Sequence, residues 1–302
     1  MAVADSTEEQ LAWEARQRPR AAIAAILGAV LTFGADLWSN QIFAGAPRSG
    51  LLEALQSAER PGPVGDTRSV RDAFYVFYND HAGEVIAASV VRAIGLIAIG
   101  WVLSFLAAAV RARRRELPRA ATWLPLVGAV LQAVASLMGT FASASGVSTY
   151  LDGPRTVDAA ADVTGSSVLV ASSFIGLVGQ FALAAAFVLI CLNALRAGLL
   201  TRFMGVVGIF VGVFIIIPLV PLSTLQAFWL VAVAFMLFGI WPGAGVPPAW
   251  RTGSAEPWPK APAVERRRGR GRPAPPAPAV EGPADERPSM AGSARRKRKR
   301  RS

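Results

Sequence analysis

The sequence contains few of the residues that enzymes and metal proteins depend on. Its 302 residues include one cysteine, Cys191, and one histidine, His81. A single cysteine excludes a disulfide within the chain and a cluster of thiolate metal ligands. His81, in the loop segment 79–84, has carboxylates nearby and would suit a metal ligand or a pH sensor, but a solvated loop histidine is the simpler interpretation.

Catalytic motifs are missing as well. We find no H-E-x-x-H, no phosphate-binding G-x-x-x-x-G-K-[ST], no G-x-S-x-G and no dinucleotide-binding glycine fingerprint. A Ser-His or Cys-His nucleophile would have to use the one histidine. We therefore predict no catalytic residue, no cofactor and no metal site, and the sequence does not favour an enzyme.

Charged residues are scarce and unevenly placed. The chain is 53% hydrophobic and only 17% charged, and the charges crowd between long apolar runs, which is typical of a multi-pass membrane protein. The formal net charge is +11, yet residues 242–302 alone hold 15 Lys and Arg against 5 Asp and Glu. The excess positive charge therefore belongs to the C-terminal segment.

A short basic loop organises the apolar runs. Residues 111–119 carry five arginines between two runs that are each long enough to cross a bilayer. Such a loop stays on the cytoplasmic side, so the remaining spans must alternate around it. The predicted spans are residues 21–39, 85–110, 120–145, 166–195, 203–220 and 225–241.

These spans predict an all-α, polytopic transmembrane helix bundle with six spans and both termini cytoplasmic. Residues 1–20 form a cytoplasmic segment whose short helix ends at Pro19, residues 21–241 form the membrane domain, and residues 242–302 form a disordered tail rich in proline and arginine. Excluding the tail, 10 Lys and Arg fall in inner segments and 5 in outer ones, as the positive-inside rule requires. The alternative makes residues 203–241 one broken or re-entrant segment and places the tail outside.

The longest outer segment covers residues 40–84. Apolar residues from Val70 to Tyr78 recur at helical spacing, which predicts an amphipathic helix on the outer membrane surface with its aromatic rings in the headgroup layer.

Two charged residues fall inside predicted spans at similar depth. Asp36 lies near the outer end of the first span, and Arg92 lies about seven residues into the second from the same side. Intramembrane charges usually pair or face the interior of a bundle. The two residues therefore predict an intramembrane ion pair, which would serve packing or form an ion or proton site. Separate snorkelling of the two side chains to the outer interface is the third interpretation.

Small and polar residues line the faces of later spans. The polar stripes serve helix packing or, as the alternative, a permeation pathway, and Gln132 and Gln180 are placed to hydrogen-bond to each other. The glycines permit close packing within the chain or in a dimer. The polar residues are Gln132, Ser136, Thr140 and Ser143 on the third span and Ser173 and Gln180 on the fourth, and the glycines are Gly205, Gly208 and Gly212 on the fifth.

A proline- and tryptophan-containing block follows the last span. It reads PPAW at residues 247–250 and GSAEPWP at residues 253–259. The chain resembles uncharacterised multi-pass membrane proteins of high-GC bacteria, which have a similar block at this place. The resemblance implies a bacterial plasma membrane location and no particular activity. In physical terms, the tryptophans of this region, Trp241, Trp250 and Trp258, are expected to anchor at the inner interface.

The basic tail predicts binding to anionic lipid headgroups, because each basic residue near such a surface adds about 1 kcal/mol. Nucleic acid is the competing partner, since the same charge attracts phosphate backbones. The residues expected to dock are Arg266, Arg267, Arg268, Arg295, Arg296, Lys297, Arg298, Lys299, Arg300 and Arg301.

These features favour a non-enzymatic accessory, scaffold or regulatory membrane protein. An unidentified membrane protein is then a further expected partner. The alternative is a small-solute or ion transporter or channel that uses the polar faces of the first four spans.

The six-span topology makes a direct prediction for reporter fusions. Phosphatase fused after Gly62 or Gly153 should be active, because both positions lie in predicted outer segments, and green fluorescent protein at the C-terminus should fluoresce in the cytoplasm. A C-terminal fusion that reports from the outer side would end the six-span interpretation.

Overall fold

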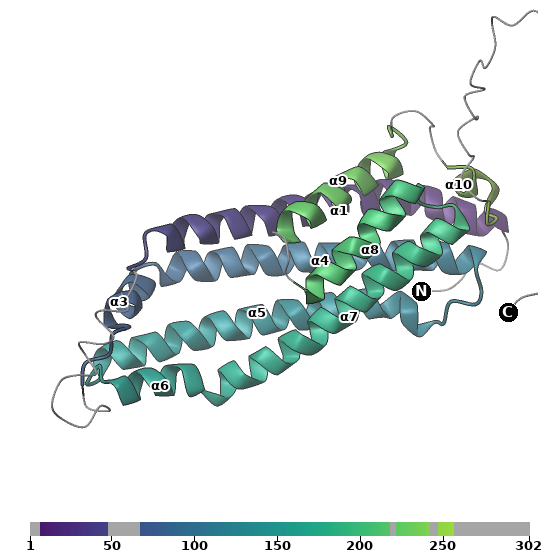
Figure 1. The fold of residues 1–302 in the computed structure, drawn as a ribbon. Coiled ribbons are helices and arrows are strands. Elements are labelled where there is room, and N and C mark those ends of the chain that lie inside the picture. The colour runs from purple at the N-terminus through teal and green to yellow at the C-terminus, as the bar shows by residue number, and fades with distance from the viewer. Residues whose placement is uncertain (1–6, 48–66, 218–221, 242–246, 257–302) are drawn as a thin grey trace, which may run out of the picture. The chain divides into compact units, whose positions relative to one another are not determined.

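The protein is all-helical in the part of the chain that the structure describes, and that part contains no β-strand (Figure 1). The structure is a computed structural model and describes residues 7–47, 67–217, 222–241 and 247–256. Of the predicted disordered tail, residues 247–256 are described and contain a short helix, α10 (Ala249–Thr252). Residues 257–302, with every basic residue expected to dock on lipid, lie outside the described residues.

Four long helices form most of the described fold: α1 (Thr7–Ala44), α4 (Ala82–Arg113), α5 (Ala120–Asp152) and α7 (Ser167–Ala197). They contain between 31 and 38 residues, so each is about 46 to 57 Å long at 1.5 Å per residue. The hydrocarbon core of a bilayer is about 30 Å thick. By length and composition, four helices are therefore able to cross a membrane, with α7 taken together with the short helix before it.

Two shorter apolar helices follow, α8 (Arg202–Ile216) and α9 (Leu222–Phe238). They pair as a hairpin: the indole Nε1 of Trp229 in α9 donates a 2.9 Å hydrogen bond to the carbonyl of Met204, near the start of α8. After α9 the chain returns to the end where α8 began (Figure 1).

The helices pack in a closed order. Each of α1, α4, α5, α7, α8 and α9 packs on the next, α9 packs back on α1, and α4 also contacts α7. Their shared core is rich in alanine from α1 and contains larger side chains such as Phe187 and Trp229, both 0% exposed.

Helix α1 is continuous through Pro19, so the expected stop at Pro19 is wrong. Proline removes one backbone hydrogen bond and strains the preceding turn, which costs roughly 3 kcal/mol in a helix interior. Tertiary contacts hold the helix on both sides of this position. Glu14 is buried before it, and Ala21 and Ala22 are buried in the core directly after it.

Two short helices lie at the end of the bundle opposite the basic loop, α3 (Asp72–Asp80) and α6 (Val157–Gly165). The expected amphipathic helix is therefore present as α3. Its aromatic face, however, packs on protein: Tyr75 lies 4.8 Å from the ring of Tyr150, and Tyr78 belongs to the same buried cluster. Of the rings on the expected face, Tyr78 is buried in this cluster, while Phe74 and Phe77 are only partly buried. Their placement in the headgroup layer stays a prediction.

Glycines allow the helix axes to approach closely. A Cβ atom added to Gly208 would collide with Cys191 Sγ of α7 and would lie 2.7 Å from Trp229 Nε1 of α9. A Cβ atom at Gly212 would lie 2.9 Å from the carbonyl oxygen of Ala184. The α8 glycines therefore serve packing within the chain rather than in a dimer.

This packing predicts the effect of one added methyl group. Gly208→Ala should lower the free energy of unfolding by about 1 to 3 kcal/mol, because neither neighbouring helix leaves room for it. The matched control is Gly34→Ala in α1, where a Cβ would meet nothing within 4 Å. The control should leave the free energy of unfolding unchanged or raise it by up to about 1 kcal/mol, because alanine has the higher helix propensity. Unfolding in detergent measures both, and equal effects would contradict the packing.

Candidate functional site

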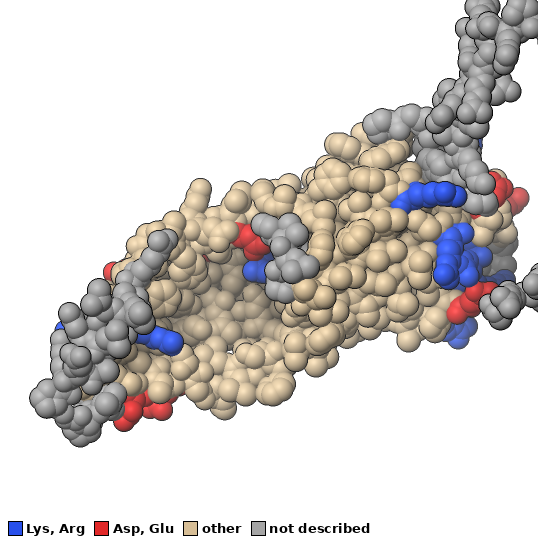
Figure 2. Space-filling view, in the orientation of Figure 1, with Lys and Arg blue, Asp and Glu red and all other residues tan. Residues whose placement is uncertain are grey.

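Arginine side chains gather at the end of the bundle where α10 (Ala249–Thr252) lies, while the middle of the visible face is mostly uncharged (Figure 2). This end combines the start of α1, the end of α4, the basic loop and the segment after α9. It also buries the charged side chains of Glu14 and Arg113.

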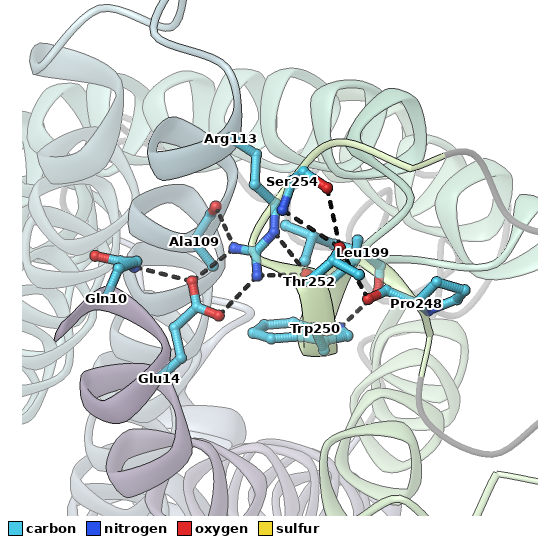
Figure 3. Close-up of polar contacts among 10 residues, drawn as sticks. Gln10, Glu14, Ala109, Arg113, Leu199, Pro248, Trp250, Thr252 and Ser254 are labelled. Carbon is cyan, nitrogen blue, oxygen red and sulfur yellow. Dashed lines mark hydrogen bonds and ion pairs between the residues drawn. The ribbon is translucent and has the colours of Figure 1, made fainter. Parts of the chain in front are cut away.

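A buried ion pair joins α1 to α4. Arg113, the last residue of α4, forms a two-point contact with Glu14: Nη1 lies 2.6 Å from Oε1 and Nη2 lies 2.8 Å from Oε2 (Figure 3). The side chain of Arg113 is 0% exposed and that of Glu14 is 1% exposed. Desolvating two charges costs several kcal/mol per ion, so such a pair persists only when its remaining hydrogen-bonding groups are also satisfied.

Backbone carbonyls complete the contacts of the Arg113 guanidinium. Nη1 donates to the carbonyl of Ala109 at 2.9 Å, and both Nε and Nη2 donate to the carbonyl of Ala249, at 3.1 and 2.7 Å. The Nε2 of Gln10 donates to the Glu14 carboxylate at 2.8 Å. Every guanidinium nitrogen thus has a partner, and α10 is fixed directly to the end of α4.

Trp250 occupies the space beneath this pair and is only 4% exposed. Its ring stacks on Phe105 with a centroid distance of 5.9 Å, and its Nε1 donates a 3.1 Å hydrogen bond to the carbonyl of Leu199. The guanidinium carbons of Arg18 and Arg113 lie 5.0 and 5.3 Å from its ring centre. Two cation–π contacts and one hydrogen bond therefore hold this indole.

The residues around Trp250 explain the local sequence block. Pro248 precedes the first helical residue of α10, and Gly253 ends the helix with φ of 70°. That left-handed conformation suits glycine, and a Cβ there would lie 2.7 Å from Thr7 of α1. We call Glu14, Arg113, Trp250 and the backbone of residues 249–253 the α10 clamp.

The expected role of the tryptophans as membrane anchors is wrong for Trp250, which is enclosed by protein. Trp241 is partly buried against the core, and Trp258 lies outside the described residues. The difference arises because Arg18 and Arg113 form a cationic site for the indole face within the bundle.

The structure also brings Asp36 and Arg92 together. Arg92 Nη1 lies 3.1 Å from Asp36 Oδ1, with the side chains 50% and 26% exposed. The two residues pair across α1 and α4, beside the close contact of Gly95 with Thr32. Burial of the pair within the bundle is not what the structure shows, because Arg92 extends out of the helix interface.

The predicted polar stripes are used mainly for local hydrogen bonds. Thr140 donates to the carbonyl of Ser136, and Ser173 donates to the carbonyl of Leu169, both at 2.9 Å. Ser143 lines a pocket together with Tyr78.

The two glutamines do not pair as expected, because Gln180 donates to the carbonyl of Ile215 in α8. The Oε1 of Gln132 is buried without a hydrogen-bond partner among the described residues.

The single cysteine and the single histidine lie in different parts of the bundle. Cys191 is buried in the core, while the Nδ1 of His81 lies 2.9 Å from the carbonyl of Phe77 and its ring stacks on that residue. Within the described ranges, no group of three or more His, Cys, Asp or Glu side chains is placed to hold a metal ion.

Sequence reasoning missed the α10 clamp altogether. Glu14 and Arg113 are separated by 99 residues, and each lies in a polar segment that resembles solvated surface. The only local sign was the PPAW block with its glycine three residues later, which indicated a constrained segment but not its partner.

Comparisons with models of protein families, with curated proteins and with solved structures find no match to this chain. The geometry described above is therefore the basis for a functional proposal.

The α10 clamp makes a prediction about stability. Glu14→Gln and Arg113→Met should each lower the free energy of unfolding by about 3 to 5 kcal/mol, because each leaves the other charged group buried and unpaired. The double variant should lose clearly less than the sum of the two, as measured by unfolding in detergent.

A matched control is Glu116→Gln in the basic loop. Glu116 pairs with Arg114 at 2.8 Å, but its side chain is 83% exposed, so the change should cost less than about 1 kcal/mol. Additive losses from Glu14 and Arg113, or a loss at Glu116 as large as that at Glu14, would contradict the role assigned to the buried pair.

Proposed function

We propose that the protein is a multi-pass integral membrane protein of the bacterial plasma membrane, with six spans and both ends in the cytoplasm. Its proposed role is that of a non-enzymatic accessory, scaffold or regulatory protein that holds a basic arm at the membrane surface. We use the term basic arm for residues 260–302.

The spacing of charges along the long helices supports this placement. On α4, the 18 residues between Arg92 and Arg111 carry no charge and extend about 27 Å. On α1, the 15 residues between Arg20 and Asp36 are also uncharged. These lengths approach the thickness of the hydrocarbon core, about 30 Å, and α8 and α9 lie alongside the same part of the bundle.

The α10 clamp is the observation that carries the proposed role. Arg113, with Glu14 and Trp250, fixes residues 249–253 to α1, to α4 and to the segment before α8. The basic arm begins seven residues after Gly253 in the sequence. A buried ion pair is costly to form because both charges must be desolvated. Its use to fix residues 249–253 suits a protein in which the basic arm has to leave the bundle at a fixed position.

A transporter or channel is the second candidate, and the unpartnered Oε1 of Gln132 favours it. A buried amide oxygen without a donor is costly, and solute or water would satisfy it. The hydroxyls of Thr140 and Ser173 already bond to carbonyls of their own helices, so these two residues favour packing.

Co-purification of the full chain in mild detergent separates these classes. A recurrent protein partner that is lost when the chain ends at Pro259 supports the accessory role. A bound small molecule or ion that persists in that shorter chain favours transport.

The arm itself makes a testable prediction. A peptide of residues 261–302 should sediment with vesicles that contain anionic lipid and release as salt rises, because seven consecutive basic residues, Arg295–Arg301, approach the surface together. The matched control is the same peptide with these seven residues changed to glutamine, which should bind much more weakly. Tight RNA or DNA binding without vesicle binding at low salt would overturn the lipid assignment.

A further inference from the structure

A pocket of about 580 Å³ opens between the first part of α1, the end of α4 and the start of α5. We call it the arginine pocket. Its charged lining consists of Arg20, Arg111 and Arg119, one from each of α1 and α4 and one directly before α5. Trp101 and Trp123 form part of its apolar wall.

The charge of the arginine pocket is uncompensated in the described structure. No Asp or Glu lines it, and none of the three arginines forms an ion pair with another described residue. Arg111 Nη1 donates to the carbonyl of Leu117 at 2.8 Å, which positions its guanidinium and leaves the other nitrogens available. Three guanidinium groups without acidic partners favour an anion with several acceptor oxygens, such as a phosphate.

Each of the three helices places its arginine at the end of an exposed apolar stripe. On α4, Arg111 shares one helical face with five residues that precede it in the chain. In order of increasing distance from Arg111 they are Ala108, Ser104, Trp101, Ile97 and Ile94. Ile94 and Ile97 are 54% and 44% exposed.

The other two helices repeat the pattern. Arg20 in α1 is followed by the exposed Ile23 and Leu27, and Arg119 before α5 is followed by the exposed Trp123 and Val130. A cationic group at the end of an apolar track matches the two parts of a phospholipid, its headgroup and its acyl chains.

A hydrogen-bond donor lies between the arginines and the apolar wall of the pocket. The Oγ of Ser104 is buried without a partner in the described part of the chain, and Ser104 lines the pocket on the same α4 stripe, between Arg111 and Trp101. A buried hydroxyl usually finds an acceptor. An ester carbonyl of a glycerophospholipid, which lies between the phosphate and the acyl chains, would meet this requirement.

We propose that the arginine pocket binds one anionic diacyl phospholipid, with its phosphate at Arg20, Arg111 and Arg119 and its acyl chains along the apolar stripes of α4 and α5. This inference rests on the proposed membrane placement. It is a site on the folded bundle, separate from the basic arm and from the α10 clamp. A free phosphate would use the arginines but would leave the apolar wall unoccupied, so the occupant that fits the whole pocket is a lipid.

The test is native mass spectrometry of the full-length chain in detergent. To remove the contribution of the arm, all 14 Lys and Arg of residues 260–302 are changed to glutamine. This chain should retain dioleoylphosphatidylglycerol at least about tenfold more tightly than dioleoylphosphatidylcholine. Arg20→Gln and Arg119→Gln should each weaken phosphatidylglycerol binding about fivefold.

The matched control is Arg202→Gln, an exposed arginine at the start of α8 that does not line the pocket. It should leave lipid binding unchanged. All three variants should melt at the same temperature without lipid, because none of these arginines has an ion-pair partner among the described residues.

Two outcomes would overturn the proposal. One is phosphatidylglycerol binding by Arg20→Gln and Arg119→Gln that is as tight as in the Arg202→Gln control. The other is binding of glycerol 3-phosphate, which has no acyl chains, as tightly as the diacyl lipid. The arm in this experiment has its basic residues replaced by glutamine, so any lipid binding that is measured comes from the folded bundle. Failure of the arm to dock on lipid and failure of the pocket to bind lipid are therefore distinguished.

Discussion

The fold of the arginine-rich end depends on one interaction, the buried pair of Glu14 and Arg113. A guanidinium without exposure to water is tolerated only because a carboxylate and the carbonyls of Ala109 and Ala249 use its donors. These partners come from α1, α4 and α10, so moving any one of the three leaves a charge without its partner. The pair therefore makes the positions of three chain segments mutually dependent.

The rest of the bundle is held together differently. Between apolar helices in lipid there is no hydrophobic driving force, so close packing and interhelical hydrogen bonds must provide the attraction. Gly95 lies against Thr32 and Gly128 lies against the backbone of Leu183, which brings neighbouring helices to the distance where dispersion is effective. Contacts that are each weak thus stabilise the length of the bundle, while one strong polar contact fixes its end.

The sequence predicts the helices better than it predicts their partners. Apolar runs and the basic loop gave both ends of α4 and α7 to within about three residues, because length and composition are local properties. Helix α1 begins 14 residues before the predicted first span, and α5 ends 7 residues after the predicted third span. The continuity of α1 through Pro19, the burial of Trp250 and the pairing of Glu14 with Arg113 depend on contacts between distant segments. A single sequence holds no local record of such contacts, since Glu14 and an exposed glutamate look the same.

Arginines at one end of this bundle occupy two different environments, and their energetic roles differ accordingly. Arg113 is fully buried and paired, so its charge contributes to the fold through fixed partners. Arg20 and Arg119 line an open pocket without acidic neighbours, so their charge remains available to an external anion. A count of basic residues, which is the basis for the proposed orientation, treats them as equivalent. Burial and pairing separate the arginine that holds the structure together from those that are free to bind.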